Sequence, residues 1–330
     1  MRQKVFVTRE IPDEGLQKIK DVFDAKVWSE EIPPSKEQII KQAEDCEGLV
    51  TLLSDPIDGE VLASIPGLKV VAQYAVGYDN IDMVTATSRR IMVTNTPGVL
   101  TEATADLTWA LILAASRRIV EADSYIRMGK WKVAWSPKLL LGTDVFNATL
   151  GIIGMGRIGS AVARRAAGFS MRVIYYSRTE NDLTRLIEKQ VGAERVDMDY
   201  LLQESDIISI HVPLTADTTN LIGSKELSMM KKRCVLVNTS RGAVVDEDAL
   251  YKALLNGDIQ AAGLDVFREE PTAHSNPLLS MPNVVVAPHI GSASTSARAR
   301  MAQMCAENLI AGLGEKTPPN IVNPEVLEFG

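Results

Sequence analysis

The feature that most constrains the fold is a glycine-rich turn near the middle of the 330-residue chain. The turn follows an apolar run at 149–153, and it precedes a helical pattern at 161–169 and a second apolar run at 172–176. It has the spacing G-x-G-x-x-G and comprises Gly154, Met155, Gly156, Arg157, Ile158 and Gly159. After a strand and before a helix, such glycines allow a tight turn, admit a pyrophosphate and let helix and strand pack closely. The pattern therefore predicts a Rossmann unit that binds a dinucleotide.

Short apolar runs alternate with helical patterns on both sides of this turn. Before it, strands are expected at 4–8, 48–53, 68–72 and 91–94, with helices between them such as 13–22 and 36–43. After it, further strands are expected at 207–212, 234–238, 262–266 and 284–287, with a helix at 246–255 and another at 295–313. This alternation is typical of parallel sheets covered on both faces. The expected fold class is α/β, with two Rossmann-like or flavodoxin-like domains.

A long stretch between the two sets of strands breaks the rhythm. Residues 101–128 contain neither glycine nor proline and hold apolar residues at helical spacing, so one or two long helices are expected. A loop rich in tryptophan, proline and glycine follows at 129–144. These two segments carry more large apolar residues than an exposed segment needs, and such a patch usually marks an interface. We therefore expect a homodimer, with an interface drawn from Trp109, Leu111, Ile112, Trp131, Trp135, Leu139, Leu140 and Leu141.

Composition excludes several classes of function. The net charge of −7 argues against a nucleic-acid partner, because such proteins usually carry a basic face. The most apolar run, 107–115, is shorter than the roughly 20 residues that span a bilayer, and the N-terminus has no apolar leader, so no membrane partner is expected. The three cysteines, Cys46, Cys234 and Cys305, fit no metal-ligand spacing. We expect a cytoplasmic protein with reduced thiols and no metal.

The end of the second strand of the Rossmann unit determines which dinucleotide fits. NAD enzymes usually carry Asp or Glu there, to bind the ribose hydroxyls. This chain has Ser177, Arg178 and Thr179 instead, with no carboxylate to repel a 2′-phosphate. The hydroxyls can donate hydrogen bonds, and the guanidinium can pair with a phosphate. NADP is therefore the expected cofactor, and NAD is the alternative.

Three histidines are candidates for the acid that carbonyl reduction by such a cofactor requires. His289 follows the strand expected at 284–287, His211 ends the strand at 207–212, and His274 lies in a polar loop. In open α/β sheets ligands bind beyond the carboxyl ends of the strands. Position alone favours His289, keeps His211 as an alternative and gives His274 little weight.

A cation and an orienting carboxylate would complete the site. Arg241 follows the strand at 234–238 and precedes Gly242, which permits close approach, so it suits a clamp for a carboxylate. Glu269 and Glu270 follow the strand at 262–266, and either one near a histidine would favour its charged form and fix its ring. The pattern does not rank these two glutamates.

Four motifs, in this order and spacing, resemble the D-isomer-specific 2-hydroxyacid dehydrogenases over essentially the whole chain. They are the glycine turn, Thr-Ser-Arg-Gly at 239–242, Leu-Asp-Val-Phe-Arg-Glu-Glu-Pro at 264–271 and Pro-His-Ile-Gly at 288–291. The resemblance implies a catalytic set of Arg241, Glu270 and His289. It also implies further cofactor-binding residues, namely Thr104, Thr239 and Asp265 at the nicotinamide end and the segment His211, Val212 and Pro213.

More narrowly, the chain is similar to the glyoxylate/hydroxypyruvate reductase branch of that family. The shared segments are 53–55, 76–82, 133–135 and 176–179. This resemblance implies reduction of glyoxylate or hydroxypyruvate to glycolate or D-glycerate. It implies substrate-binding residues Leu53, Ser54, Val76, Gly77, Arg241 and Trp135, the last reaching into a neighbouring subunit. Ser136 and Leu139 stand where that branch has His and an aromatic residue, which leaves the exact keto acid open.

The resemblance also implies that one domain is inserted into the other. Residues 1–99 and 291–330 are expected to form the substrate, or catalytic, domain and 100–290 the dinucleotide-binding domain. Alternative functions are a phosphoglycerate, D-lactate or phosphite dehydrogenase. A dinucleotide-binding corepressor is a further alternative, because fold alone does not decide function.

Overall fold

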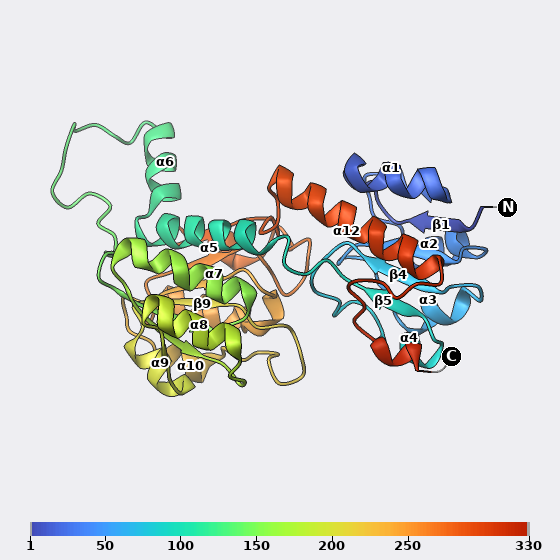
Figure 1. Cartoon of the computed structure of the whole chain (residues 1–330). Coiled ribbons are helices and arrows are strands. Elements are labelled where there is room, and N and C mark those ends of the chain that lie inside the picture. Colours follow the sequence, from blue (N-terminus) through green and yellow to red (C-terminus); the bar gives the residue numbers. More distant parts are fainter. Residues whose placement is uncertain (1, 329–330) are drawn as a thin grey trace. The chain divides into compact units, whose positions relative to one another are not determined.

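The computed structural model describes residues 2–328. The chain folds into two compact units (Figure 1). The first unit contains residues 1–100 and 292–330, and the second contains residues 101–291, so the second is inserted into the first. Each unit has its own parallel sheet with helices on both faces, which confirms the predicted fold class. Within residues 2–328, no helix is both long enough and apolar enough to cross a membrane.

The first unit has a five-stranded sheet in the order β2-β1-β3-β4-β5, which is the flavodoxin-like order. Its strands are β1 (Lys4–Val7), β2 (Asp24–Val27), β3 (Gly48–Thr51), β4 (Val70–Gln73) and β5 (Met92–Thr94). Its helices are α1 (Asp13–Val22), α2 (Lys36–Ala43), α3 (Gly59–Ser64), α4 (Met83–Ser88) and α12 (Thr295–Leu313). Helices α1 and α12 pack together, and α12 lies against β3, β4 and β5. Helices α2, α3 and α4 cover a core that includes Phe6, Leu49 and Val71.

The second unit has a seven-stranded sheet in the order β12-β11-β10-β9-β6-β7-β8, a Rossmann arrangement with one further strand. Its strands are β6 (Thr149–Ile153), β7 (Arg172–Tyr176), β8 (Glu194–Arg195), β9 (Ile207–Ile210), β10 (Val235–Asn238), β11 (Ala261–Leu264) and β12 (Val284–Val286). Its helices are α5 (Thr101–Ser116), α6 (Ile119–Arg127), α7 (Arg157–Ala166), α8 (Asp182–Val191), α9 (Met198–Glu204), α10 (Ser224–Met229) and α11 (Glu247–Asn256). Helices α5, α7 and α8 share one core, and α9, α10 and α11 share the other.

Two expectations for this unit need correction. The helix after the glycine turn begins at Arg157 rather than at residue 161, because the turn itself provides its first residues. Part of the expected interface is also buried within the unit. Trp109 stacks on Phe169 with ring centroids 4.7 Å apart, and Leu111 and Ile112 lie in the same core. These three side chains are therefore not available to a partner.

Candidate active site

The glycine turn between β6 and α7 has the backbone that an anion site requires. Gly154 has a φ of 98°, and a Cβ there would lie 2.7 Å from the carbonyl oxygen of His211, so only glycine fits. Gly156 is the N-cap of α7 without a side-chain cap, and a Cβ there would meet no atom within 4 Å. The amides of the first three residues of α7 have no acceptor within residues 2–328, so a pyrophosphate could accept their hydrogen bonds. The turn also lies against His211 and Val212.

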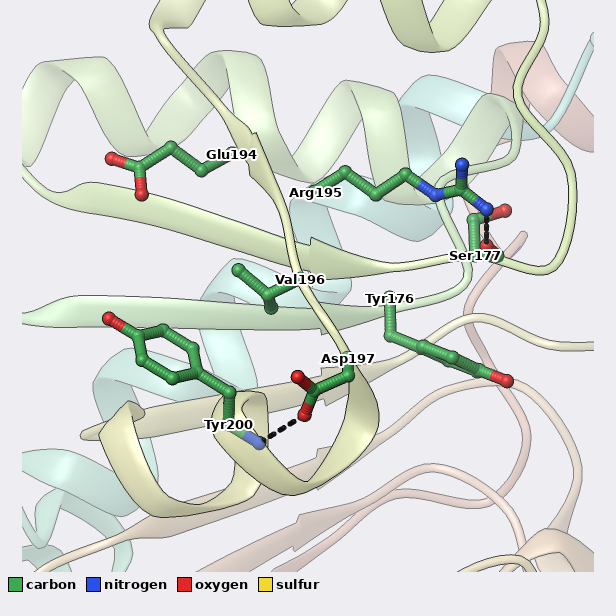
Figure 2. A pocket seen from close by; sticks show the side chains of 7 residues that line it. All are labelled: Tyr176, Ser177, Glu194, Arg195, Val196, Asp197 and Tyr200. Carbon is green, nitrogen blue, oxygen red and sulfur yellow. Dashed lines mark hydrogen bonds between the residues drawn. The ribbon is translucent and has the colours of Figure 1, made fainter.

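The segment after β7 lies next to a pocket of about 590 Å³ at the edge of the sheet (Figure 2). The guanidinium of Arg195 donates to the carbonyl oxygens of Ser177, at 2.9 Å, and Arg178, at 3.3 Å. The hydroxyl of Ser177 donates to the carbonyl of Thr179 at 3.1 Å. These bonds hold the backbone of residues 177–179 on both sides of the Arg178 side chain. Sequence reasoning missed Arg195, because the pairing of β8 with β7 that places it there depends on tertiary structure.

Arg178 itself extends into solvent beside an acidic neighbour. Its Nη1 lies 3.3 Å from a carboxylate oxygen of Asp217, and both side chains are exposed. An exposed ion pair of this kind contributes little stability, so the guanidinium can change partner at small cost. The segment 177–179 itself contains no Asp or Glu.

His289 and Glu270 form the closest polar pair of the predicted catalytic set. The Nδ1 atom of His289 lies 2.6 Å from Oε2 of Glu270, and the two side chains are 24% and 30% exposed. The other carboxylate oxygen of Glu270 accepts from the amide of Phe267 at 2.9 Å. With Nδ1 donating to the carboxylate, Nε2 is the ring atom left for a substrate. Glu269, which the residue pattern alone did not rank against Glu270, is exposed and makes no such bond within the described residues.

Asp265 fixes the backbone on which His289 stands. Its carbonyl oxygen accepts from the amide of His289 at 2.8 Å, and its carboxylate accepts from Ile290 and Gly291, each at 2.7 Å. His289 has a φ of 53°, a left-handed conformation that costs a non-glycine residue free energy and persists where the surroundings enforce it. Burial raises the pKa of Asp265 above its ordinary value, while the two amides counteract that rise.

Arg241 reaches its position because the next residue is glycine. A Cβ on Gly242 would lie 1.8 Å from the carbonyl carbon of Phe267, so the loops after β10 and β11 touch only with glycine there. Asn238, at the end of β10, donates to the carbonyl of Arg241 at 2.8 Å. The structure thereby brings the backbone of Arg241 beside the segment that carries Glu270.

The electrostatics of this cluster keep Glu270 charged. Burial on its own would raise the pKa of Glu270, but the hydrogen bond and charge of His289, the amide of Phe267 and the charge of Arg241 outweigh it. The net effect is a pKa of Glu270 below its ordinary value. The carboxylate therefore remains ionised at neutral pH and can stabilise a protonated His289.

His211 differs from His289 in its surroundings. Its Nε2 lies 2.8 Å from the hydroxyl of Ser209, and burial lowers the pKa of His211 to about 3. The ring is therefore neutral at physiological pH and unsuited to donate a proton. His274 lies in an exposed loop. These positions support the choice of His289 as the acid.

The remaining predicted residues divide between the two units. In the second unit, Thr104 and Thr239 are buried, and the hydroxyl of Thr108 lies 2.9 Å from that of Thr239 and donates to the carbonyl of Thr104 at 2.8 Å. Pro213 and Thr179 are exposed, and Trp135 is 76% exposed in the loop after α6. In the first unit, Leu53 and Ser54 follow β3, and Val76 and Gly77 follow β4.

A Rossmann sheet whose glycine turn is open to a pyrophosphate, with a His–Glu pair after its strands, defines an NAD(P)-dependent dehydrogenase. The model of the D-isomer specific 2-hydroxyacid dehydrogenase NAD-binding domain matches residues 109–291. A glyoxylate reductase of Korarchaeum cryptofilum is 58% identical over 99% of this chain and 98% of the relative. One of Thermococcus litoralis is 52% identical over the same shares. The chain belongs to the D-isomer-specific 2-hydroxyacid dehydrogenase family.

Solved structures agree with this assignment. The crystal structure of a Thermus thermophilus protein has a TM-score of 0.90 and 45% identity, and the match covers 97% of this chain and all of that one. An NADPH-dependent glyoxylate/hydroxypyruvate reductase of Sinorhizobium meliloti, solved with NADP and malonate, has a TM-score of 0.87 and 32% identity. That match covers 99% of this chain and 98% of the other.

Proposed function

We propose that this enzyme reduces glyoxylate and hydroxypyruvate to glycolate and D-glycerate with NADPH. The observation that carries the proposal is the 2.6 Å pair of His289 and Glu270, held on the same unit as the glycine turn and Arg241. The glyoxylate reductases among its relatives support the choice of keto acid. Steady-state oxidation of NADPH over a panel of 2-keto acids tests it. A preference for pyruvate or phosphohydroxypyruvate over both proposed substrates would contradict it.

Each residue of the set has a role that its chemistry allows. The bound dinucleotide supplies the hydride, and the open amides of α7 would hold its pyrophosphate. The guanidinium of Arg241 binds the substrate carboxylate and polarises the carbonyl. The Nε2 of His289 donates a proton to the developing alkoxide, and Glu270 keeps the ring charged and oriented. The first unit then serves as the substrate domain and the second as the dinucleotide-binding domain.

NADPH preference is expected to depend on the segment after β7. The double variant S177D/R178I replaces a hydroxyl with a carboxylate and removes the guanidinium that would pair with the 2′-phosphate. We expect the ratio of kcat/KM for NADPH to that for NADH to fall on the order of 10²-fold, since charge-assisted hydrogen bonds are lost and a like charge is added.

Arg185→Ile is a matched control for that variant, because Arg185 is as exposed as Arg178 (58% against 59%) and lies on α8, outside the segment. It removes one positive charge without touching the proposed 2′-phosphate pocket, so the cofactor ratio should stay near that of the wild type. A wild-type enzyme that already favours NADH strongly would refute the NADPH proposal.

A homodimer built on α6 and the loop at 129–146 is proposed as well. Several large apolar side chains are exposed there, and an apolar patch of this kind usually marks an interface. They are Ile119, Val120, Ile126, Met128, Trp131, Val133, Trp135, Leu139, Leu141 and Phe146. In a two-fold dimer each subunit would give its Trp135 to its neighbour and thereby limit the size of the substrate.

Trp135→Ala should relax this size limit. The kcat/KM for 2-ketobutyrate relative to glyoxylate should rise roughly 10-fold. Truncation of the indole makes room for the longer keto acid, and a 10-fold change corresponds to about 1.4 kcal/mol in transition-state binding. Trp131→Ala is the control, since Trp131 lies in the same loop and is 52% exposed. Light scattering that shows an active monomer would contradict the dimer, and an unchanged substrate profile in a dimeric Trp135→Ala would contradict the shared site.

A cytoplasmic location is proposed from the thiols. Cys46, Cys234 and Cys305 are buried and unpaired, and burial raises the pKa of each to about 11 or 12. Such thiols are unreactive and form no cross-link, which suits a reducing compartment. Fractionation of cells that express the tagged protein tests this location.

A further inference from the structure

Three consecutive carbonyl groups after β4 are held by donors from the ends of two strands. The carbonyl of Ala75 accepts from the amide of Thr96 at 2.8 Å, and that of Val76 accepts from Nδ2 of Asn95 at 2.8 Å. The third, of Gly77, accepts from Nε2 of Gln73 at 3.3 Å. Gln73 is the last residue of β4, and the other two donors directly follow β5, the neighbouring strand.

These three bonds determine where the following amides point. In a planar trans peptide the N–H group is opposite the C=O group. The amides of Val76, Gly77 and Tyr78 therefore point away from the donors at the strand ends. None of the three donates a hydrogen bond within residues 2–328. Successive backbone N–H groups of this kind form a concavity that binds anions.

Gln73 is oriented by a partner of its own. Its side chain is fully buried, and its Oε1 accepts from the hydroxyl of Thr51 at 2.6 Å. This bond directs the Nε2 end toward Gly77 and toward Oδ1 of Asn80, to which it donates at 2.8 Å. Rotation of the Gln73 amide by 180° would lose both bonds that Nε2 donates, to Gly77 and to Asn80.

Asn80 extends the network to the loop after β3. Its Nδ2 donates to the carbonyl oxygens of Leu52, at 3.1 Å, and Asp55, at 2.9 Å. Those two carbonyls flank Leu53 and Ser54, the other proposed substrate-binding residues of this unit. The side-chain amides of Gln73 and Asn80 therefore fix the two proposed substrate-binding segments of the first unit relative to each other.

We propose that Gln73, acting with Asn80, is a positioning residue for the substrate carboxylate, and that the amide of Tyr78 joins those of Val76 and Gly77 in binding it. The proposal rests on the proposed function for the identity of the anion. Gln73 touches neither substrate nor cofactor in this role. It fixes the direction of the amides before substrate arrives, and such preorganisation is what makes backbone donors effective.

Gln73→Met tests the proposal, because methionine has a similar shape and no hydrogen-bonding amide. The KM for glyoxylate should rise roughly 10- to 100-fold, as expected for loss of one or two charge-assisted hydrogen bonds. The kcat at saturating glyoxylate and the Kd for NADPH should change less than about 3-fold, because the catalytic set is untouched. Binding of oxamate, a carboxylate that is not reduced, should weaken in parallel when measured by calorimetry with NADPH present.

Asn323→Leu is the matched control in the same unit. Asn323 is equally buried, donates to the carbonyl of Ile91 at 2.9 Å and accepts from the amide of Val93 at 2.8 Å, but contacts neither loop. It should lower the midpoint of thermal unfolding without raising KM. Thr51→Val, which removes only the group that orients Gln73, should raise KM by a few-fold and guards against misfolding of Gln73→Met.

The outcomes separate the proposal from the function it rests on. A folded Gln73→Met with wild-type KM and wild-type oxamate affinity would overturn the positioning role. So would a rise in KM of the same size in Asn323→Leu, because that would show a general effect of instability. Loss of oxamate binding in Gln73→Met would support the role even if the wild type reduced none of the keto acids, a result that would overturn only the proposed function.

Discussion

Replacement of His289 with alanine is expected to lower kcat by ~10²–10⁴-fold, the usual contribution of a positioned general acid. The imidazole that would protonate the substrate oxygen is lost, while Asp265 still holds the backbone of the segment through its bonds to Ile290 and Gly291. Steady-state turnover of glyoxylate with NADPH measures the effect. The fold should remain intact by circular dichroism.

His274→Ala is the control, because His274 is exposed and lies outside the cluster. It should turn over at the wild-type rate. Fluorescence titration should give nearly equal Kd values for NADPH in the wild type and both variants. Near-normal turnover in His289→Ala would show that His289 is not the general acid.

Glu270→Gln is expected to reduce kcat/KM by ~10–10³-fold at neutral pH, because the hydrogen bond to His289 can persist while the charge that stabilises the imidazolium is lost. The pKa of Glu270 is lowered in the folded protein. The stability that the ionised Glu270 contributes to the folded protein is therefore fully present above the ordinary carboxyl pKa. It is lost only as the pH falls through the lowered pKa of Glu270.

The pH profile distinguishes this role from a structural one. In the wild type, protonation of Glu270 should limit activity only in strongly acidic solution. In Glu270→Gln this acid limb of kcat/KM should disappear, because the amide that replaces the carboxyl group does not titrate. Glu269→Gln, the exposed neighbour, should leave the acid limb in place. A parallel loss in Glu269→Gln would show that the segment, not the His289–Glu270 pair, carries the effect.

Much of the fold could be predicted because the signals are local. The strands β6 and β7 and the helices α1, α2 and α12 have the bounds that periodicity gave, since each combines an apolar pattern with recognisable ends. The position of the break between α5 and α6 could not be predicted. It falls at Arg118, a non-glycine residue with a φ of 54°, and no glycine or proline marks it.

The site was predictable only in part, for a related reason. The residue pattern alone left Glu269 and Glu270 unranked, and the family resemblance then selected Glu270 together with Arg241 and His289. The loop after β11 places Glu270 2.6 Å from the histidine. Gln73 and Asn95 carry no motif at all. They matter because β4 pairs with β5 and brings their side chains beneath one loop, and such a relation exists only after the chain has folded.

The bonds of Asp265 to residues 289–291 have one more consequence. Gly291 is the last residue of the second unit, and the chain passes into the first at residue 292. The three bonds therefore tie the proposed proton donor to the end of β11 immediately before the crossover. Whatever motion the two units undergo, the distance between His289 and the glycine turn is set within one unit. The proposed acid thus keeps its alignment with the proposed cofactor site.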